Sequence, residues 1–144
     1  MSHVTTIDVQ VKDLDALEAA CKELGLELVR GKTTYKWFGQ FMGDSALPPG
    51  MTKDQLGKCQ HAVRVPGNDR AYEVGVVQQP DGTFRLAWDA WSGGYGLMER
   101  VGDNCGRLVQ SYAAQVATKQ ARKQGYSVQR KVLADGKIQL QLTR

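Results

Sequence analysis

A glycine-rich aromatic segment holds the densest group of side chains suited to ligand contact. Residues 88–96 read Trp-Asp-Ala-Trp-Ser-Gly-Gly-Tyr-Gly and include two of the three tryptophans of the chain. Glycines permit backbone conformations that other residues avoid, and aromatic rings offer flat surfaces for stacking. The segment suits a binding loop, and it equally suits a tight corner wrapped by core aromatic side chains.

Apolar and polar residues alternate in the strand that ends this segment's first part, and this alternation separates the core residue of the segment from the candidate ligand-binding residues. Trp88 shares its parity with Phe84 and Leu86, which predicts that it lies in the core. The two later aromatic residues fall beyond that alternation, between a hairpin and a long helix. The candidate ligand-binding residues here are Trp91, Tyr95, Asn104 and Arg107.

The last third of the chain carries an excess of positive charge. Residues 1–98 hold ten Lys/Arg against twelve Asp/Glu, whereas residues 99–144 hold nine against three. Such a segment attracts anionic partners, although a spread of solvated lysines gives the same count. Arg122 and Arg130 join the candidate site as phosphate contacts, which predicts a nucleotide-like ligand or a nucleic acid as the partner.

Cys105 is the one candidate nucleophile. It sits at the start of the long helix, where unpaired amide groups can lower the pKa of a thiol. Nucleophilic catalysis also needs a base, and only His3 and His61 are available. The alternative is that Cys105 is the first apolar residue of the helix stripe.

No metal site or cofactor is expected. Cys59 and His61 are two ligands at close spacing, but a zinc or copper site needs three or four. The chain contains no Cys-x-x-Cys pair, no phosphate-binding loop with its lysine and no dinucleotide fingerprint.

Length and composition favour a single domain over residues 1–144 in a reducing compartment. The three cysteines have no paired spacing, no apolar run could cross a bilayer, and no signal peptide is recognisable. We therefore expect a cytoplasmic protein without a membrane partner. Self-association into a homo-oligomer is left open.

The first half of the chain alternates between strand-like and helix-like patterns. Residues 4–11 alternate apolar and polar side chains, as a half-buried strand does. Asp13 can cap a helix whose apolar residues recur at helical spacing up to Leu24. A second strand is expected at 26–30, with 33–41 extending or following it.

Glycines and prolines then predict a long surface loop at about 43–59, with one helical turn at 51–56. A strand at 61–65 follows. Residues 71–91 predict a hairpin that turns at Gln79-Pro80-Asp81-Gly82.

A long helix over 104–124 and a hairpin over 126–143 complete the chain. We expect Ala113 and Ala117 to let the helix lie close to a sheet. The helix stripe comprises Cys105, Leu108, Val109, Tyr112, Ala113, Val116, Ala117 and Gln120. The resulting order, β-α-β-β-β-β-α-β-β, predicts an α+β fold with an antiparallel-rich sheet and two helices packed on one face.

Several segments together resemble a known family in their order and spacing. They are residues 1–6, 13–17, 23–25, 79–89, 102–104, 107–113, 125–126 and 135–136. The chain is similar in them to the hypothetical chloroplast reading frame number thirty-five family, except over about 35–58. The resemblance implies a small free-standing domain of unknown function from cyanobacteria, algal plastids and bacteriophages. It implies no activity or catalytic residue, and it does not require cysteine at position 105.

Three functions follow as hypotheses. The first is a non-enzymatic protein that binds an anionic partner through the basic C-terminal third and the aromatic loop. The second is a phage-type interaction module that inhibits or sequesters a host protein, in which case it acts in the host cytoplasm. The third is a cysteine-dependent enzyme that uses Cys105.

Overall fold

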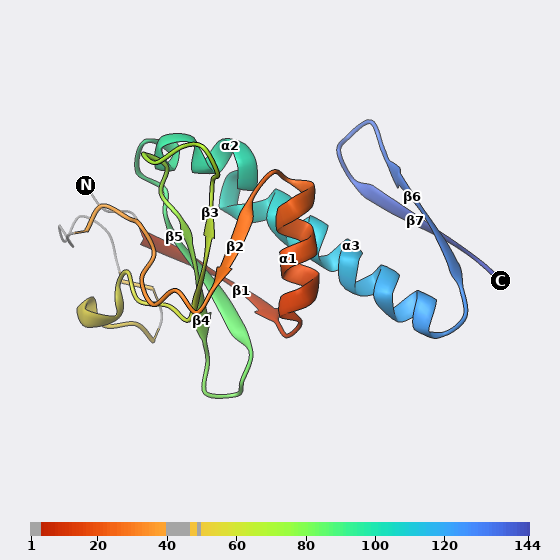
Figure 1. Cartoon of the computed structure of the whole chain (residues 1–144), viewed down its shortest axis with the longest axis horizontal. Helices are drawn as coiled ribbons and strands as arrows, with labels where there is room; N and C mark the ends of the chain where they lie inside the picture. Colours follow the sequence, from red (N-terminus) through yellow and green to blue (C-terminus); the bar gives the residue numbers. More distant parts are fainter. Residues whose placement is uncertain (1–3, 40–46, 49) are drawn as a thin grey trace.

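The structure is a computed structural model that describes residues 4–39, 47–48 and 50–144, with the side chains of the first strand described from Gln10 onward. The larger elements are strands and two long helices (Figure 1). In chain order they are β1 (Val4–Val11), α1 (Leu14–Glu23), β2 (Glu27–Arg30), β3 (His61–Arg64), β4 (Val74–Gln78), β5 (Phe84–Asp89), α2 (Leu97–Val101), α3 (Gly106–Lys123), β6 (Ser127–Val132) and β7 (Ile138–Thr143). The predicted order of strands and long helices is confirmed, and so is the α+β class. The unpredicted additions are α2 and the short 3-10 turns η1 (Lys53–Gln55), η2 (Trp91–Gly96) and η3 (Asp103–Cys105).

Five strands form one antiparallel sheet in the order β1-β5-β4-β3-β2. β1 and β2 are therefore the two edges, and α1 carries the chain from one edge to the other. β6 and β7 form a second, two-stranded sheet that lies beside α3 at one end of the molecule (Figure 1). The C-terminal hairpin is thus separate from the main sheet.

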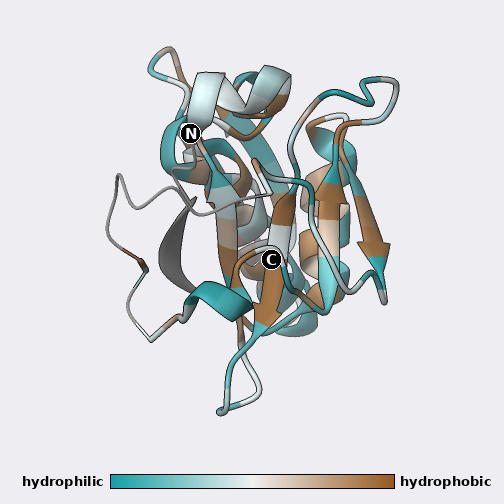
Figure 2. Ribbon diagram, turned by 90° about the vertical axis from the view of Figure 1, so that its left-hand side faces the viewer, coloured by the Kyte–Doolittle hydropathy of each residue, from teal (hydrophilic) through white to brown (hydrophobic). Residues whose placement is uncertain are grey.

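Both long helices pack on the same face of the main sheet. The core here joins Leu17 and Cys21 of α1 and Leu108 of α3 to the strand residues Val74 and Trp88. Trp88 is buried, which confirms its predicted place in the core. Figure 2 shows hydrophobic residues along the strands and helices, whereas the exposed turns are mainly hydrophilic.

Polar contacts cap α1 and fix its start to α3. The side chain of Asp13 accepts the Ala16 N–H at 3.0 Å and caps α1, as predicted. The hydroxyl of Tyr112 in α3 accepts the Lys12 N–H at 3.0 Å, so α3 holds the start of α1.

A connecting segment, rather than a helix, covers the opposite face of the sheet. Tyr35 and Cys59 pack there on Ala62 and Ala87. A Cβ added to Gly75 would lie 2.4 Å from Tyr35 Cδ1, so the ring rests directly on a strand residue that has no side chain. This close approach is what Gly75 permits.

The segment between β2 and β3 differs in part from the prediction. Residues 33–39 form no regular strand but make one bridge, Thr34 to Lys58. The predicted helical turn at 51–56 is the short η1. Residues 40–46 and 49, which belong to the predicted strand and loop, lie outside the described residues.

The predicted stripe of the long helix was partly wrong. Ala113 and Ala117 are exposed, whereas Ala114 and Ala121 are buried. The reason is that α3 packs against α1 and also against both strands of the hairpin, so its buried surface turns around the helix. The helix also begins at Gly106 rather than at position 104, because the two preceding residues have left-handed backbone conformations.

Candidate anion-binding surface

The six predicted ligand residues lie in two separate places. Trp91, Tyr95 and Asn104 lie in the corner between β5 and α3, with Arg107 in the first turn of that helix. Arg122 follows fifteen residues later, which places it about 22 Å further along the helix axis. The structure therefore does not bring the six residues together in one site.

The corner is built from a left-handed turn. Ser92, Gly93, Gly94 and Tyr95 all have φ between 50° and 65°. Such a conformation costs a non-glycine residue about 1–2 kcal/mol, so two of the four positions are strained. The Tyr72 N–H donates to the Gly94 carbonyl at 2.8 Å and so ties the turn to the segment before β4.

The two aromatic residues of the corner have different surroundings. Trp91 is half-buried and packs against the helix-side core, so little of its ring is open to a ligand. Tyr95 is 39% exposed and stands edge-on to Tyr72, with ring centroids 5.1 Å apart. The Arg70 guanidinium lies 5.9 Å from the Tyr95 ring. Tyr95 is therefore the aromatic residue of this corner with a free surface.

Asn104 and Arg107 have structural roles at the start of α3. Asn104 is exposed and has φ 53°, a conformation that asparagine tolerates better than most residues. Arg107 Nη1 donates to the Glu99 carbonyl at 2.7 Å, which anchors the guanidinium to α2. This corner therefore holds one exposed ring and a tethered cation.

Arg130 is neutralised by an acidic residue of α1. Its Nη1 lies 2.6 Å from Glu23 Oε1, while Glu23 Oε2 accepts the Ser111 hydroxyl at 2.8 Å. Gln115 also donates to this carboxylate. Burial opposes the charge of Glu23, but the hydrogen bonds from Arg130, Ser111 and Gln115 outweigh it and lower the pKa of the carboxyl. Glu23 thus fixes the hairpin against both helices.

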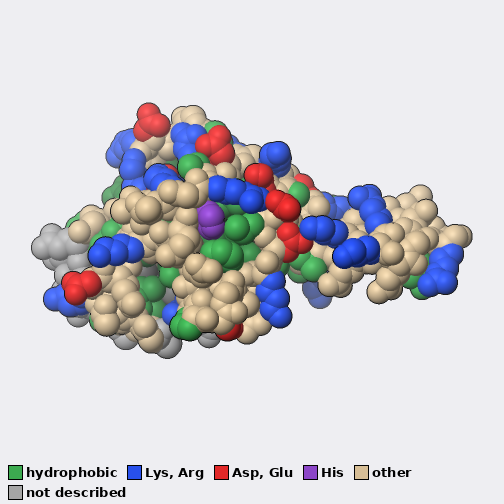
Figure 3. Space-filling model, turned by 60° about the horizontal axis from the view of Figure 1, so that its bottom comes forward, with side chains coloured by type: hydrophobic (Ala, Val, Ile, Leu, Met, Phe, Trp, Pro, Cys, Tyr) green, Lys and Arg blue, Asp and Glu red, His purple; other side chains and the backbone are tan. Residues whose placement is uncertain are grey.

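The end of α3 and the β6–β7 hairpin, residues 120–144, form what we call the C-terminal lobe. It holds six Lys/Arg and one acidic residue, Asp135. Arg122, Lys123 and Lys131 are exposed and make no ion pair with any described residue. Figure 3 shows blue Lys/Arg side chains, and no red acidic one, on the narrow right-hand end of this face. The lobe is therefore a projecting cationic surface.

The cysteines lie in the core and are poorly placed for nucleophilic chemistry. Cys105 is fully buried, and burial raises the pKa of its thiol, which is the reverse of what a nucleophile needs. Cys59 donates to the Lys32 carbonyl, while His61 Nδ1 accepts the Gly31 N–H. No cluster of three metal-ligating side chains occurs among the described residues.

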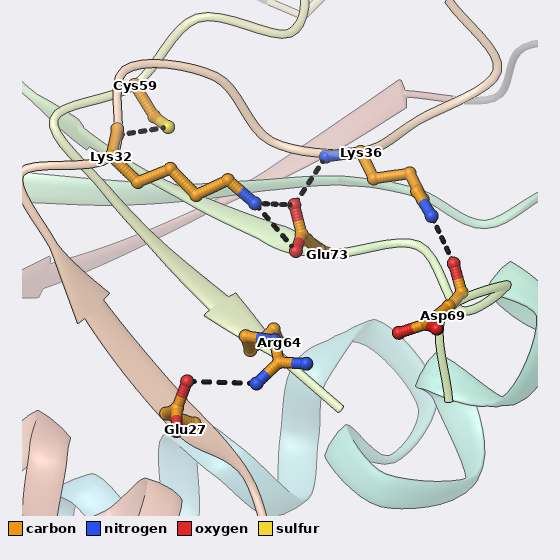
Figure 4. Close-up of polar contacts among 7 residues, drawn as sticks. All are labelled: Glu27, Lys32, Lys36, Cys59, Arg64, Asp69 and Glu73. Atoms are coloured by element: carbon orange, nitrogen blue, oxygen red, sulfur yellow. Dashed lines mark hydrogen bonds and ion pairs between the residues drawn. The ribbon is translucent and has the colours of Figure 1, made fainter. Parts of the chain in front are cut away.

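A buried carboxylate that the sequence analysis missed organises the segment after β2. Glu73 accepts the Lys32 ammonium at 2.8 and 2.9 Å and the Lys36 N–H at 2.8 Å (Figure 4). Arg64, on the neighbouring strand, pairs with Glu27 instead. Each carboxylate of this cluster is paired with a cation. We therefore interpret the cluster as a structural clamp that holds the segment after β2 in place. Its one sequence signal is an acidic residue that directly precedes the apolar strand β4.

An open groove of about 650 Å³ lies between the η1 segment and the turn from β4 to β5. Its polar lining includes Gln55, Lys58, Gln60, Gln78 and Arg85, and no acidic side chain is among the described lining residues. This size is in the range of small-molecule sites. Lys58 and Arg85 are the charged residues of its described lining, and sequence periodicity gave no signal for this groove.

No family model, curated protein or solved structure matches this chain. Membership of the chloroplast reading frame family therefore stays a prediction. Among the helices that the structure describes, none is long and apolar enough to cross a membrane. The functional argument thus depends on the geometry and charge of the molecule itself.

Proposed function

We propose that this protein binds a nucleic acid through its C-terminal lobe. The observation that carries the proposal is the set of exposed, unpaired cations Arg122, Lys123 and Lys131 on a projecting lobe with a single acidic residue. The corner with Tyr95 is a less suitable centre, because its arginine at 107 is tethered and its tryptophan is largely covered.

The expected interaction is mainly with phosphate groups. Each phosphate that a cation neutralises releases counterions, so the affinity falls steeply with salt. Three cations in contact with duplex DNA would contribute about 2.7 to the slope of log K against log salt, at about 0.9 for each phosphate.

The test compares two triple variants of equal charge change. Arg122→Gln/Lys123→Gln/Lys131→Gln removes the cations of the lobe, and Lys12→Gln/Lys58→Gln/Arg70→Gln removes three exposed cations elsewhere. Fluorescence anisotropy with a labelled 20-base-pair duplex at several salt concentrations should show a weaker affinity and a flatter slope for the lobe variant alone. Equal losses for both variants, or no binding by the natural protein, would contradict the proposal.

A protein-interaction module is the second candidate, because the hairpin exposes apolar side chains and unpaired strand edges. Val132 is 66% exposed and Leu142 is 47% exposed. Such an edge can accept a strand from a partner protein. Val132→Thr/Leu142→Thr should then abolish partner capture without changing nucleic-acid binding.

A further inference from the structure

The β6–β7 hairpin has one face composed entirely of hydrogen-bonding side chains. Strand register places three pairs directly opposite each other on that face, and all six residues are exposed. We call it the outer face; its pairs are Ser127 with Thr143, Gln129 with Gln141, and Lys131 with Gln139. The face carries four amide or ammonium groups and no carboxylate.

The other face of the hairpin turns toward the body of the protein. Val128, Ile138 and Leu140 are half-buried there, whereas Val132 and Leu142 at the two ends of the same face are exposed, and β6 and β7 both pack against α3. Arg130 lies on this inner face and reaches Glu23 of α1. The inner face therefore anchors the hairpin, and the outer face is directed away from the domain.

The dimensions of the hairpin match the major groove of B-form DNA. Six residues in a strand extend about 20 Å, and two paired strands lie about 4.8 Å apart. The major groove is about 12 Å wide and admits a two-stranded ribbon. Within the same lobe, Arg122 and Lys123 lie on the last turn of α3, just before β6 in the chain, and could meet the flanking phosphates.

We propose that the β6–β7 ribbon enters the major groove of duplex DNA and contacts base edges with its outer face. This inference rests on the proposed nucleic-acid binding. Gln129 and Gln141 have the amide geometry that pairs with N6 and N7 of adenine, whereas Lys131 keeps the phosphate contact proposed above. The cations of α3 supply affinity, whereas the outer face supplies sequence preference.

Duplex DNA fits this surface better than the other polyanions do. The major groove of an RNA duplex is too deep and narrow for side chains to read. Single strands are bound mainly by stacking on aromatic side chains, and the outer face contains none. A partner protein paired along the strand edges would leave the outer face free, so that alternative gives a different result in the experiment below.

The first experiment uses the natural protein and changes only the DNA. Selection from a random pool of 20-base-pair duplexes should enrich a preferred sequence. The enriched duplex is then made with 7-deazapurines, which lack the N7 acceptor in the major groove but keep base pairing and phosphates. We expect the affinity to fall about fivefold or more, since a good bidentate contact contributes discrimination of about that order or above.

The second experiment changes the ribbon. Gln129→Thr/Gln141→Thr keeps residues that favour strands but shortens the side chains. It should abolish the preference for the enriched duplex while leaving the salt slope unchanged. The matched control is Gln120→Ala/Gln124→Ala, which removes two exposed glutamines of the same lobe, one in α3 and one at its C-cap, and should leave the preference intact.

The outcomes separate the two proposals. Equal binding of the 7-deazapurine duplex, or no enriched sequence, overturns the groove inference, although the lobe cations can still give salt-dependent binding. Tighter binding of an RNA duplex or a single strand also overturns it. If no nucleic acid binds at all, the proposed function and the inference both fail.

Discussion

Replacement of Glu73 by glutamine tests whether the buried carboxylate holds the segment after β2, which contains Lys32 and Lys36, on the sheet. Glu73 is 7% exposed and accepts three hydrogen bonds, two from the Lys32 ammonium and one from the Lys36 N–H. The substitution keeps the shape of the side chain but removes its charge and turns one acceptor into a donor that faces the ammonium.

The expected cost follows from the bonds that are lost. A glutamine oxygen in the place of Glu73 Oε1 can still accept the Lys36 N–H and one N–H of Lys32, whereas the second bond from Lys32 and the ion pair are lost. Hydrogen bonds to charged groups contribute about 1.5–3 kcal/mol each, and the partly exposed Lys32 side chain can recover some of this from water. We therefore expect Glu73→Gln to lower the free energy of unfolding by about 2–3 kcal/mol, which corresponds to about 5–10 °C in Tm.

Glu27→Gln is the matched control. Glu27 is also paired with a cation, Arg64 at 3.0 Å, but its side chain is 53% exposed. An exposed ion pair contributes about 0.2–1 kcal/mol, so this variant should lie within about 1 kcal/mol of the natural protein. Urea unfolding followed by circular dichroism measures both. If Glu73→Gln costs no more than Glu27→Gln, the assignment of a structural clamp is wrong.

Three further predictions concern single positions. Asn104→Ala should lower stability by about 1 kcal/mol, because φ is 53° there, and Asn104→Gly should not; equal effects would contradict the strain argument. Gly75→Ala should cost about 1–3 kcal/mol in urea unfolding, because the new Cβ would meet the ring of Tyr35, and the Tyr35→Ala background should reduce that cost. Burial lowers the pKa of His61, whose Nδ1 accepts the Gly31 N–H. The neutral imidazole therefore contributes to the free energy of unfolding above about pH 6.5, and this contribution is lost as the pH falls through the lowered pKa. His61→Gln should therefore flatten the dependence of stability on pH below 6.5, and an unchanged dependence would refute this.

Local patterns predicted the parts of the fold that depend on neighbouring residues. The turn at 79–82 and the alternation through Trp88 are encoded within a few residues, and both appear in the structure. The start of α3 was missed by two positions, because helical periodicity continues through Asn104 although its backbone is left-handed. Apolar spacing carries no information on the sign of φ.

The candidate site was harder to predict because it depends on contacts between distant segments. Arg130 looked like a free cation, yet Glu23 neutralises it from a separate helix. The sequence patterns did not single out Glu73, yet it pairs with Lys32 and is buried. Charge counts therefore located the basic third of the chain, but only the structure distinguishes its tethered cations from its unpaired ones.

The separation of the β6–β7 sheet from the main sheet also bears on how the protein opens. A two-stranded sheet is only marginally stable by itself, and this one is supported chiefly by α3. We expect amide protons of β6 and β7 to exchange with solvent through opening of the lobe alone, while those of the central strands β4 and β5 exchange only when the whole domain unfolds. A ligand on the lobe would then slow amide exchange in the hairpin and leave exchange in the central strands unchanged. Amide exchange in β6 and β7 would therefore measure directly whether a ligand is bound to the lobe.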